Sequence, residues 1–239
     1  MLSASDGAVS LLLVTAASLA SFHTLIGVDH SVPFIILGRA RGWSLRRTLG
    51  ITGACGLVHV ASSALIGSAG LLLGIALNQL AWLESTRGNV AAGLMIGFGL
   101  SYTARAVWYG FRRASHTRSR KHADGTAETY SCDHHDVNLR TDGKSRDMTP
   151  WALFLVFAFG PCELLIPLMV VPATERSWLL LGAVVGVFGV FTVGAMLAAV
   201  TLGYLGLSCV QLGAFERRID VLAGLTIAAS GTAVFLFGV

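Results

Sequence analysis

Two matching stretches decide the fold: HTLIGVDHSVP at residues 23–33 and FGPCELLIP at residues 159–167. Each stretch sets a glycine, at least one proline and a pair of polar residues inside a long apolar run. Glycine and proline free backbone hydrogen-bonding groups, which is tolerated at membrane depth only beside protein or a watery cavity. We therefore expect a membrane protein with broken helices at Gly27 and Gly160, and with its functional site at those breaks.

The composition of the 239-residue chain agrees with a membrane protein. Only 13% of residues are charged and the mean hydropathy is +0.70, whereas about a quarter of residues are charged in soluble domains. Residues 112–149 alone hold eight of the 17 Lys and Arg and six of the 13 Asp and Glu. The fold class that we predict is all-α and integral to the membrane. Runs long enough to cross a bilayer of about 30 Å lie at 10–37, 49–77, 89–111, 150–171, 179–207 and 219–239.

The basic residues predict how these six spans are oriented. Fourteen Lys and Arg fall on one side, namely four between spans one and two, eight in the polar loop and two after span five. The opposite connections hold only Arg87 and Arg176. The positive-inside rule then places both termini outside and the loop in the cytoplasm of an inner-membrane protein. The first span lacks a basic leader and is expected to stay in the mature protein.

The two halves of the chain repeat each other. A shift of 133 residues pairs Gly27 with Gly160, Gly53 with Gly186, Gly56 with Gly189 and Gly70 with Gly203. A shift of 131 then matches Ala-Gly-Leu at 92–94 to Ala-Gly-Leu at 223–225. Three spans are an odd number, so the halves insert with opposite orientation, as in many transporters. We expect repeat one over 1–111, a cytoplasmic loop over 112–149 and repeat two over 150–239.

Ionisable residues inside the spans are the candidate site, because such residues are costly in a membrane and usually functional. They are His23, Asp29, His30, His59, Cys162 and Glu163. The shift of 133 sets Asp29-His30 opposite Cys162-Glu163. Counting about 1.5 Å per helical residue puts Asp29, His59 and Cys162 roughly 13 to 16 Å deep, near the bilayer centre. Imidazole, thiolate and carboxylate together suit nickel, cobalt, zinc or copper better than an alkaline-earth ion.

Structural interpretations of the same residues stay open. His23 precedes His30 by seven residues, about 10 Å along a helix, and reaches the same ion only across a break at Gly27. It is otherwise a packing or access-path residue. Asp29 and His30 can instead simply bond to each other or to a neighbouring helix, and Cys162 alone would be a small apolar side chain.

The motifs resemble a known family. His23, Asp29-His30 and the following Gly56-Leu-Val-His59 are similar to the signature of the nickel/cobalt transporter family, in which His, four residues and Asp-His precede a Gly-His helix. Here five residues separate His23 from Asp29. Residues 159–163 with Pro167 look more like the urease-accessory transmembrane proteins and their cytochrome c biogenesis relatives. The resemblance covers about half of the chain and implies a six-span permease of inverted repeats, with Asp29, His30 and His59 as metal ligands.

The polar loop at 112–149 lacks apolar periodicity, and we expect it to be flexible. It contains His116, His122 and the cluster Cys132-Asp-His-His-Asp136. Dense His and Cys tracts can collect metal ions, although no spacing here matches a zinc finger. A solvated linker and a cytoplasmic metal collector are both consistent with this composition.

The function that we predict is a divalent transition-metal permease with a midplane site of His23, Asp29, His30, His59, Cys162 and Glu163. The alternatives are a thiol-disulfide electron relay, which lacks a symmetric second cysteine because Cys162 is matched by Asp29, and a proton-coupled exporter of a small anion or metabolite. No protease or hydrolase motif occurs, so we do not expect an enzyme. The metal ion is a transported substrate, and no resident cofactor is expected. Expected partners are the bilayer, a metallochaperone or metalloenzyme maturation protein, and a second copy of the chain, but not nucleic acid.

Overall fold

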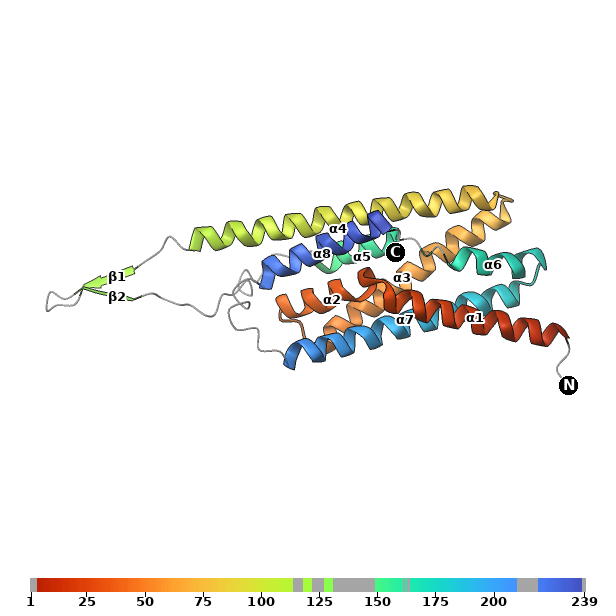
Figure 1. The fold of residues 1–239 in the computed structure, drawn as a ribbon, viewed down its shortest axis with the longest axis horizontal. Coiled ribbons are helices and arrows are strands. Elements are labelled where there is room, and N and C mark those ends of the chain that lie inside the picture. Colours follow the sequence, from red (N-terminus) through yellow and green to blue (C-terminus); the bar gives the residue numbers. More distant parts are fainter. Residues whose placement is uncertain are drawn as a thin grey trace.

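The computed structural model describes residues 4–113, 118–121, 127–130, 149–160, 162, 164–209 and 219–237. The helices of these residues pack side by side in an elongated bundle (Figure 1). They are α1 (Ala4–Ile26), α2 (Val28–Ala40), α3 (Leu45–Leu72), α4 (Leu77–Arg113), α5 (Thr149–Phe159), α6 (Leu165–Thr174), α7 (Trp178–Cys209) and α8 (Ile219–Phe237).

Five helices of the described chain are long and apolar enough to cross a membrane. Their apolar segments are Gly7–Ile26, Leu45–Leu72, Leu77–Tyr109, Trp178–Leu207 and Ile219–Leu236. Two shorter apolar helices, Pro150–Phe159 and Leu165–Thr174, follow each other where a single fourth span was expected. The predicted helical character is therefore confirmed, and the five long apolar helices are consistent with the predicted multi-pass membrane protein.

The polar loop contains regular structure that was not predicted. Strand β1 (Arg118–Lys121) pairs antiparallel with β2 (Ala127–Tyr130), and Arg118 lies opposite Tyr130. The residues between the strands include Asp124-Gly125, a dipeptide favoured in tight hairpin turns. The polar composition of residues 112–149 led instead to the prediction of a flexible loop.

The two predicted helix breaks are confirmed. Gly27 separates α1 from α2 with an extended backbone, φ −63° and ψ 101°, and its N–H donates to the His23 carbonyl at 2.9 Å. Pro33 inside α2 has no N–H, so the Asp29 carbonyl four residues earlier loses its helical donor. The second break separates Phe159, the last residue of α5, from α6.

One predicted span boundary is wrong. The third span was expected at 89–111 with Arg87 in the preceding connection, but α4 begins at Leu77. Glu84 and Arg87 therefore lie within the helix, where both are buried. Arg87 was assigned to a connection because charges lower the local hydropathy, whereas in the fold it forms an ion pair with Glu84.

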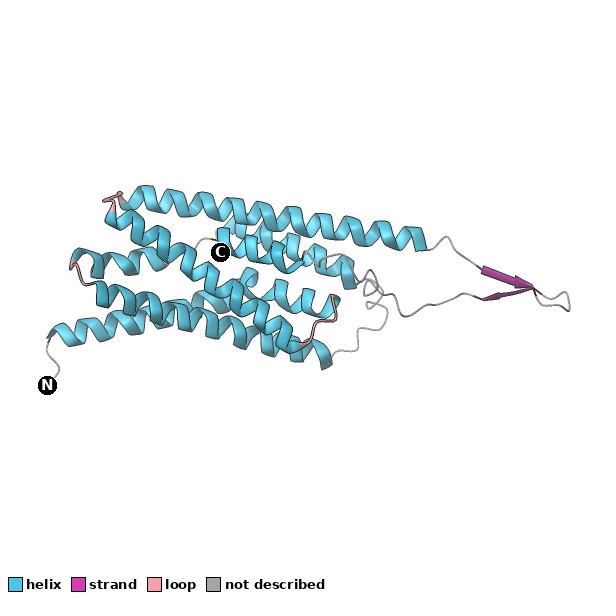
Figure 2. Cartoon of the chain, turned by 180° about the vertical axis from the view of Figure 1, so that it is seen from behind, coloured by secondary structure: helices cyan, strands magenta, loops and turns pink. Residues whose placement is uncertain are grey.

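The broken helices of the two halves run in opposite directions. From α1 to α2 the chain leaves the end of the bundle that holds the N-terminus, whereas from α5 to α6 it returns toward that end (Figure 1). The last residues of α2, α4 and α7 share the opposite end, and the view from behind shows the same arrangement (Figure 2). The basic residues of the first connection, Arg39, Arg41, Arg46 and Arg47, lie at or beside the end of α2.

Helices α3 and α7 touch through two glycines. A Cβ added at Gly56 would lie 3.2 Å from Val193, and one added at Gly189 would lie 3.3 Å from Val60. A shift of 133 residues relates Gly56 to Gly189 and Val60 to Val193, so the two contacts are reciprocal.

Candidate functional site

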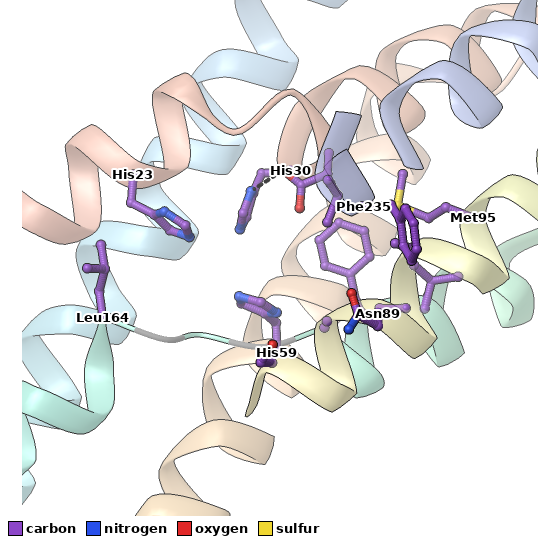
Figure 3. A pocket seen from close by; sticks show the side chains of 16 residues that line it. His23, His30, His59, Asn89, Met95, Leu164 and Phe235 are labelled. Atoms are coloured by element: carbon purple, nitrogen blue, oxygen red, sulfur yellow. Dashed lines mark hydrogen bonds and ion pairs between the residues drawn. The ribbon is translucent and has the colours of Figure 1, made fainter. Parts of the chain in front are cut away.

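Three histidines from three helices meet at the first helix break. His23 lies in the last turn of α1, His30 in the first turns of α2, and His59 in the middle of α3. The ring centroids of His23 and His30 are 5.0 Å apart, and those of His30 and His59 are 5.3 Å apart. Figure 3 shows the three rings directed toward one another. The break at Gly27 removes the separation along one helix that would have kept His23 from His30.

Asp29 orients the central ring. Nδ1 of His30 lies 2.8 Å from Oδ1 of Asp29, and the carboxylate is partly exposed while the ring is buried. An ionised carboxylate only accepts hydrogen bonds, so the proton of this pair belongs on Nδ1. The neutral ring then presents the lone pair of Nε2, which is how carboxylate partners prepare histidines to bind metals.

Four of the five remaining ring nitrogens of the cluster are buried and have no hydrogen-bond partner among the described residues. These atoms are Nε2 of His23, Nε2 of His30 and both ring nitrogens of His59. The main chain of Phe157 lies beside the His59 ring without a hydrogen bond of normal geometry. An unpartnered buried polar group costs about 1–3 kcal/mol. Water or a ligand that reached these nitrogens would relieve this cost on all three rings.

A cavity of about 360 Å³ lies against the histidines. Helix α4 contributes Ser85, Asn89 and Met95 to its wall, α5 contributes Phe157, and α8 contributes Phe235. Figure 3 shows the histidines on one side and Asn89, Met95 and Phe235 on the other. The cavity is far larger than the share of liquid volume of one water molecule, about 30 Å³. It therefore has room for a small cation together with part of its hydration shell.

Both helix breaks leave space for a histidine ring. A Cβ at Gly27 would overlap Nδ1 of His30, and a Cβ at Gly160 would lie 3.1 Å from Nδ1 of His59. Gly27 and Gly160 are the glycines that the 133-residue shift aligns. Each break thus allows a close approach between backbone and imidazole that any other residue would obstruct.

The predicted site residues are only partly brought together. His23, Asp29, His30 and His59 line one cavity. Cys162 is fully buried in an apolar cluster with Ala16, Ala20 and Phe188 and does not line the cavity. Glu163 lies outside the described residues, as do His116, His122 and the 132–136 cluster. Among the described residues, no three His, Cys, Asp or Glu side chains are placed to hold one metal ion as they stand.

Sequence reasoning missed the buried ion pair behind the cavity. Glu84 is 1% exposed, and its carboxylate accepts a hydrogen bond from Nη1 of Arg87. The signal was present as Glu-Ser-Thr-Arg, since charges three residues apart share one helix face. The two residues were instead taken to lie in a polar connection.

No known protein family matches the chain, and neither does any curated protein or solved structure. The resemblance to nickel/cobalt transporters therefore rests on the sequence motifs alone.

Proposed function

We propose that this chain is a multi-pass permease for a divalent transition-metal ion, nickel or cobalt above all, with zinc and copper as alternatives. The observation that carries the proposal is the meeting of His23, His30 and His59 at a helix break, where they line one cavity and four of their ring nitrogens have no partner among the described residues. Imidazole is a preferred ligand for these ions. Asp29 adds a negative charge that offsets part of the charge of a cation in a low dielectric.

The proposed transport path uses the break between α1 and α2. A ring rotation at His23, His30 or His59 would be needed before one ion could contact several of them, because no three ligands converge among the described residues. Rotation is possible because four of the six ring nitrogens of the cluster make no hydrogen bond. Glu163 is proposed as a further ligand from the sequence alone, and Cys162 would join only if the second break moved.

We further propose that six crossings form two inverted three-span repeats, with the polar loop in the cytoplasm of an inner-membrane protein. Support comes from the opposite directions of the two broken helices (Figure 1) and from the reciprocal contacts of Gly56 and Gly189. The basic residues beside α2 support the orientation. Inverted repeats around a central site are a recurring transporter plan.

A thiol-disulfide relay is less well supported than metal transport. Cys55 and Cys162 lie in separate apolar clusters. An electron relay requires two thiols within bonding distance, with Cα atoms less than about 7 Å apart. Nothing in these positions favours the relay over the histidine cavity.

Metal accumulation in cells tests the proposal. Cells that express the wild type, Asp29→Asn or His30→Ala are compared for nickel and cobalt content by elemental analysis. Ser101→Ala is the matched control, since its hydroxyl is exposed and bonds only to the Gly97 carbonyl of its own helix. We expect both site variants to lose the change in metal content that the wild type produces. Wild-type accumulation in both site variants would contradict metal transport.

Metal binding to purified protein is a second test that does not depend on the direction of transport. A ligand present at 100 times its Kd stabilises the folded state by about 2.7 kcal/mol. That stabilisation raises the Tm of a chain of this size by about 5–11 °C. We expect this shift with nickel or cobalt in the wild type and a smaller one in His59→Ala. An equal shift in both proteins would place the metal elsewhere.

A further inference from the structure

The buried pair Glu84 and Arg87 is joined to α3 by two serines. Arg87 donates from Nη1 to Glu84 and to Ser63 Oγ, the latter at 3.4 Å, and from Nη2 to Ser62 Oγ at 2.9 Å. Ser63 Oγ also donates to Glu84 Oε2 at 3.4 Å. A buried ion pair is expensive unless its remaining donors and acceptors are used. Here the remaining donors and acceptors of the pair form hydrogen bonds with α3 and with the backbone at the second helix break.

Arg87 satisfies carbonyls that the end of α5 leaves without partners. Its Nη2 donates to the Ala158 carbonyl at 3.1 Å and to the Gly160 carbonyl at 3.4 Å. The last four carbonyls of a helix have no donor within the helix. The planar guanidinium supplies several donors in a fixed geometry, which a lysine ammonium cannot reproduce.

Glu84 serves the other side of the same break. The N–H of Cys162 donates to Glu84 Oε2 at 3.2 Å and to Ser63 Oγ at 3.1 Å. The pair thus offers donors to the carbonyls before the break and acceptors to the amide after it. Exchanging Glu84 and Arg87 would preserve the ion pair. It would, however, place the carboxylate beside the carbonyl acceptors and the guanidinium beside the N–H donor of Cys162.

The same contacts lead to His59. Ser62, which accepts from Arg87, donates to the His59 carbonyl at 2.9 Å. Gly160, whose carbonyl accepts from Arg87, lines the cavity and approaches the His59 ring. The pair therefore holds both the backbone of His59 and the backbone that faces its ring.

We propose that Glu84 and Arg87 are positioning residues that hold the α5–α6 break against His59 and so form the second wall of the transport site. The proposal rests on the proposed function only where it speaks of a transport site, since the contacts themselves involve no metal. When the pair is weakened, the break moves away and His59 becomes accessible. His30 keeps its surroundings, because none of the described contacts of the pair reaches α2.

Chemical labelling of the histidines tests this role without metal. Purified wild-type protein in detergent is treated with diethyl pyrocarbonate, and labelling at His23, His30 and His59 is measured separately by mass spectrometry. Arg87→Lys keeps the charge and loses the carbonyl contacts. Thr86→Ala is the matched control, since its hydroxyl bonds only to the Trp82 carbonyl of its own helix. Thermal unfolding verifies that each variant is folded.

We expect the ratio of His59 to His30 labelling to rise about tenfold or more in Arg87→Lys, since hydrogen bonds from charged groups are the stronger class. The ratio should stay within about twofold of wild type in Thr86→Ala, because surface changes rarely alter stability much. An unchanged ratio in folded Arg87→Lys overturns the proposal. An equal rise at all three histidines also overturns it, because a general loss of stability would expose them together.

Two further measurements apply if Arg87→Lys does not fold. Ser63→Ala removes an acceptor of the Cys162 N–H without changing any charge, and it should raise the same labelling ratio; no rise overturns the proposal. In the wild type, the Cys162 amide should exchange slowly with deuterium, and fast exchange overturns the proposal by itself. Failure of the metal-accumulation test would leave these results unaffected, so the two proposals fail separately.

Discussion

Replacing Gly27 by alanine should disturb the histidine site through one added methyl group. The backbone at Gly27, φ −63° and ψ 101°, is open to alanine, so no backbone strain is expected. The new Cβ would overlap His30 Nδ1 and would lie 2.9 Å from Asp29 Oδ1. These are the two atoms that form the 2.8 Å hydrogen bond, so the ring of His30 has to move and the bond is lost.

The expected loss of stability follows from that bond. A hydrogen bond with a charged partner contributes about 1.5–3 kcal/mol, and the reduced freedom of the unfolded chain returns about 0.4–1 kcal/mol when glycine becomes alanine. The net cost is about 0.5–2.6 kcal/mol. At about 2–4 °C per kcal/mol for a chain of this length, the Tm falls by about 1–10 °C.

Thermal unfolding of purified protein, followed by helical circular dichroism in detergent, measures this shift. Gly93→Ala is the matched control, because nothing lies within 4 Å of a Cβ added there. Alanine inside a helix is favoured over glycine by about 0.5–1 kcal/mol, so this control should be as stable as the wild type or more stable. If Gly27→Ala unfolds at the temperature of Gly93→Ala, the steric reasoning is wrong.

A double-mutant cycle attributes the cost of Gly27→Ala to His30. Without the His30 ring the closest clash of the new methyl group is gone, and only Asp29 Oδ1 at 2.9 Å and the His23 carbonyl at 3.1 Å remain near it, so Gly27→Ala should cost less in a His30→Ala background. Residues in contact commonly show interaction energies of about 0.5–3 kcal/mol in such cycles. An equal cost in both backgrounds would refute the assignment to this ring.

Two further substitutions test the packing of α4 against α8, with the same unfolding assay. Gly99→Ala would push a Cβ to 2.5 Å from the main-chain nitrogen of Ala228, and overpacking of this kind costs about 1–3 kcal/mol. Gly97→Ala, which meets nothing within 4 Å, should be neutral, and equal stability of the two variants would contradict the packing. Tyr102→Phe loses the hydroxyl that donates to Asp220 Oδ1 at 2.7 Å and should cost about 1.5–3 kcal/mol. An unchanged Tm in this variant would show that water replaces the hydroxyl.

The helix breaks could be predicted from sequence because they have local causes. Glycine at 27 and 160, with nearby prolines, lowers helix stability within a few residues of itself. The break then explains why His23 reaches His30, with ring centroids 5.0 Å apart, although the two residues lie about 10 Å apart along an unbroken helix.

The partners of the second break could not be predicted, because they come from a distant part of the chain. Glu84 and Arg87 reduce hydropathy when each residue is scored alone, and although their spacing of three residues suggests an ion pair, only the fold shows that the pair reaches the second break. Cys162 illustrates a related limit. The 133-residue shift matched Cys162 to Asp29. Such a match aligns backbone positions only, and outside a helix it does not determine where a side chain points. Its side chain is buried in an apolar cluster.

The two breaks therefore differ in what becomes of their polar groups. At Gly27 four histidine ring nitrogens have no partner among the described residues, and the three histidines line the cavity. At Gly160 the described backbone groups are bound by Glu84 and Arg87. Buried groups that lack partners can contribute to binding a ligand, whereas groups that are already hydrogen-bonded would have to give up those bonds first. In the proposed permease, the ion contacts of the described residues should consequently concentrate on the first half, while the described backbone of the second half supplies a rigid wall.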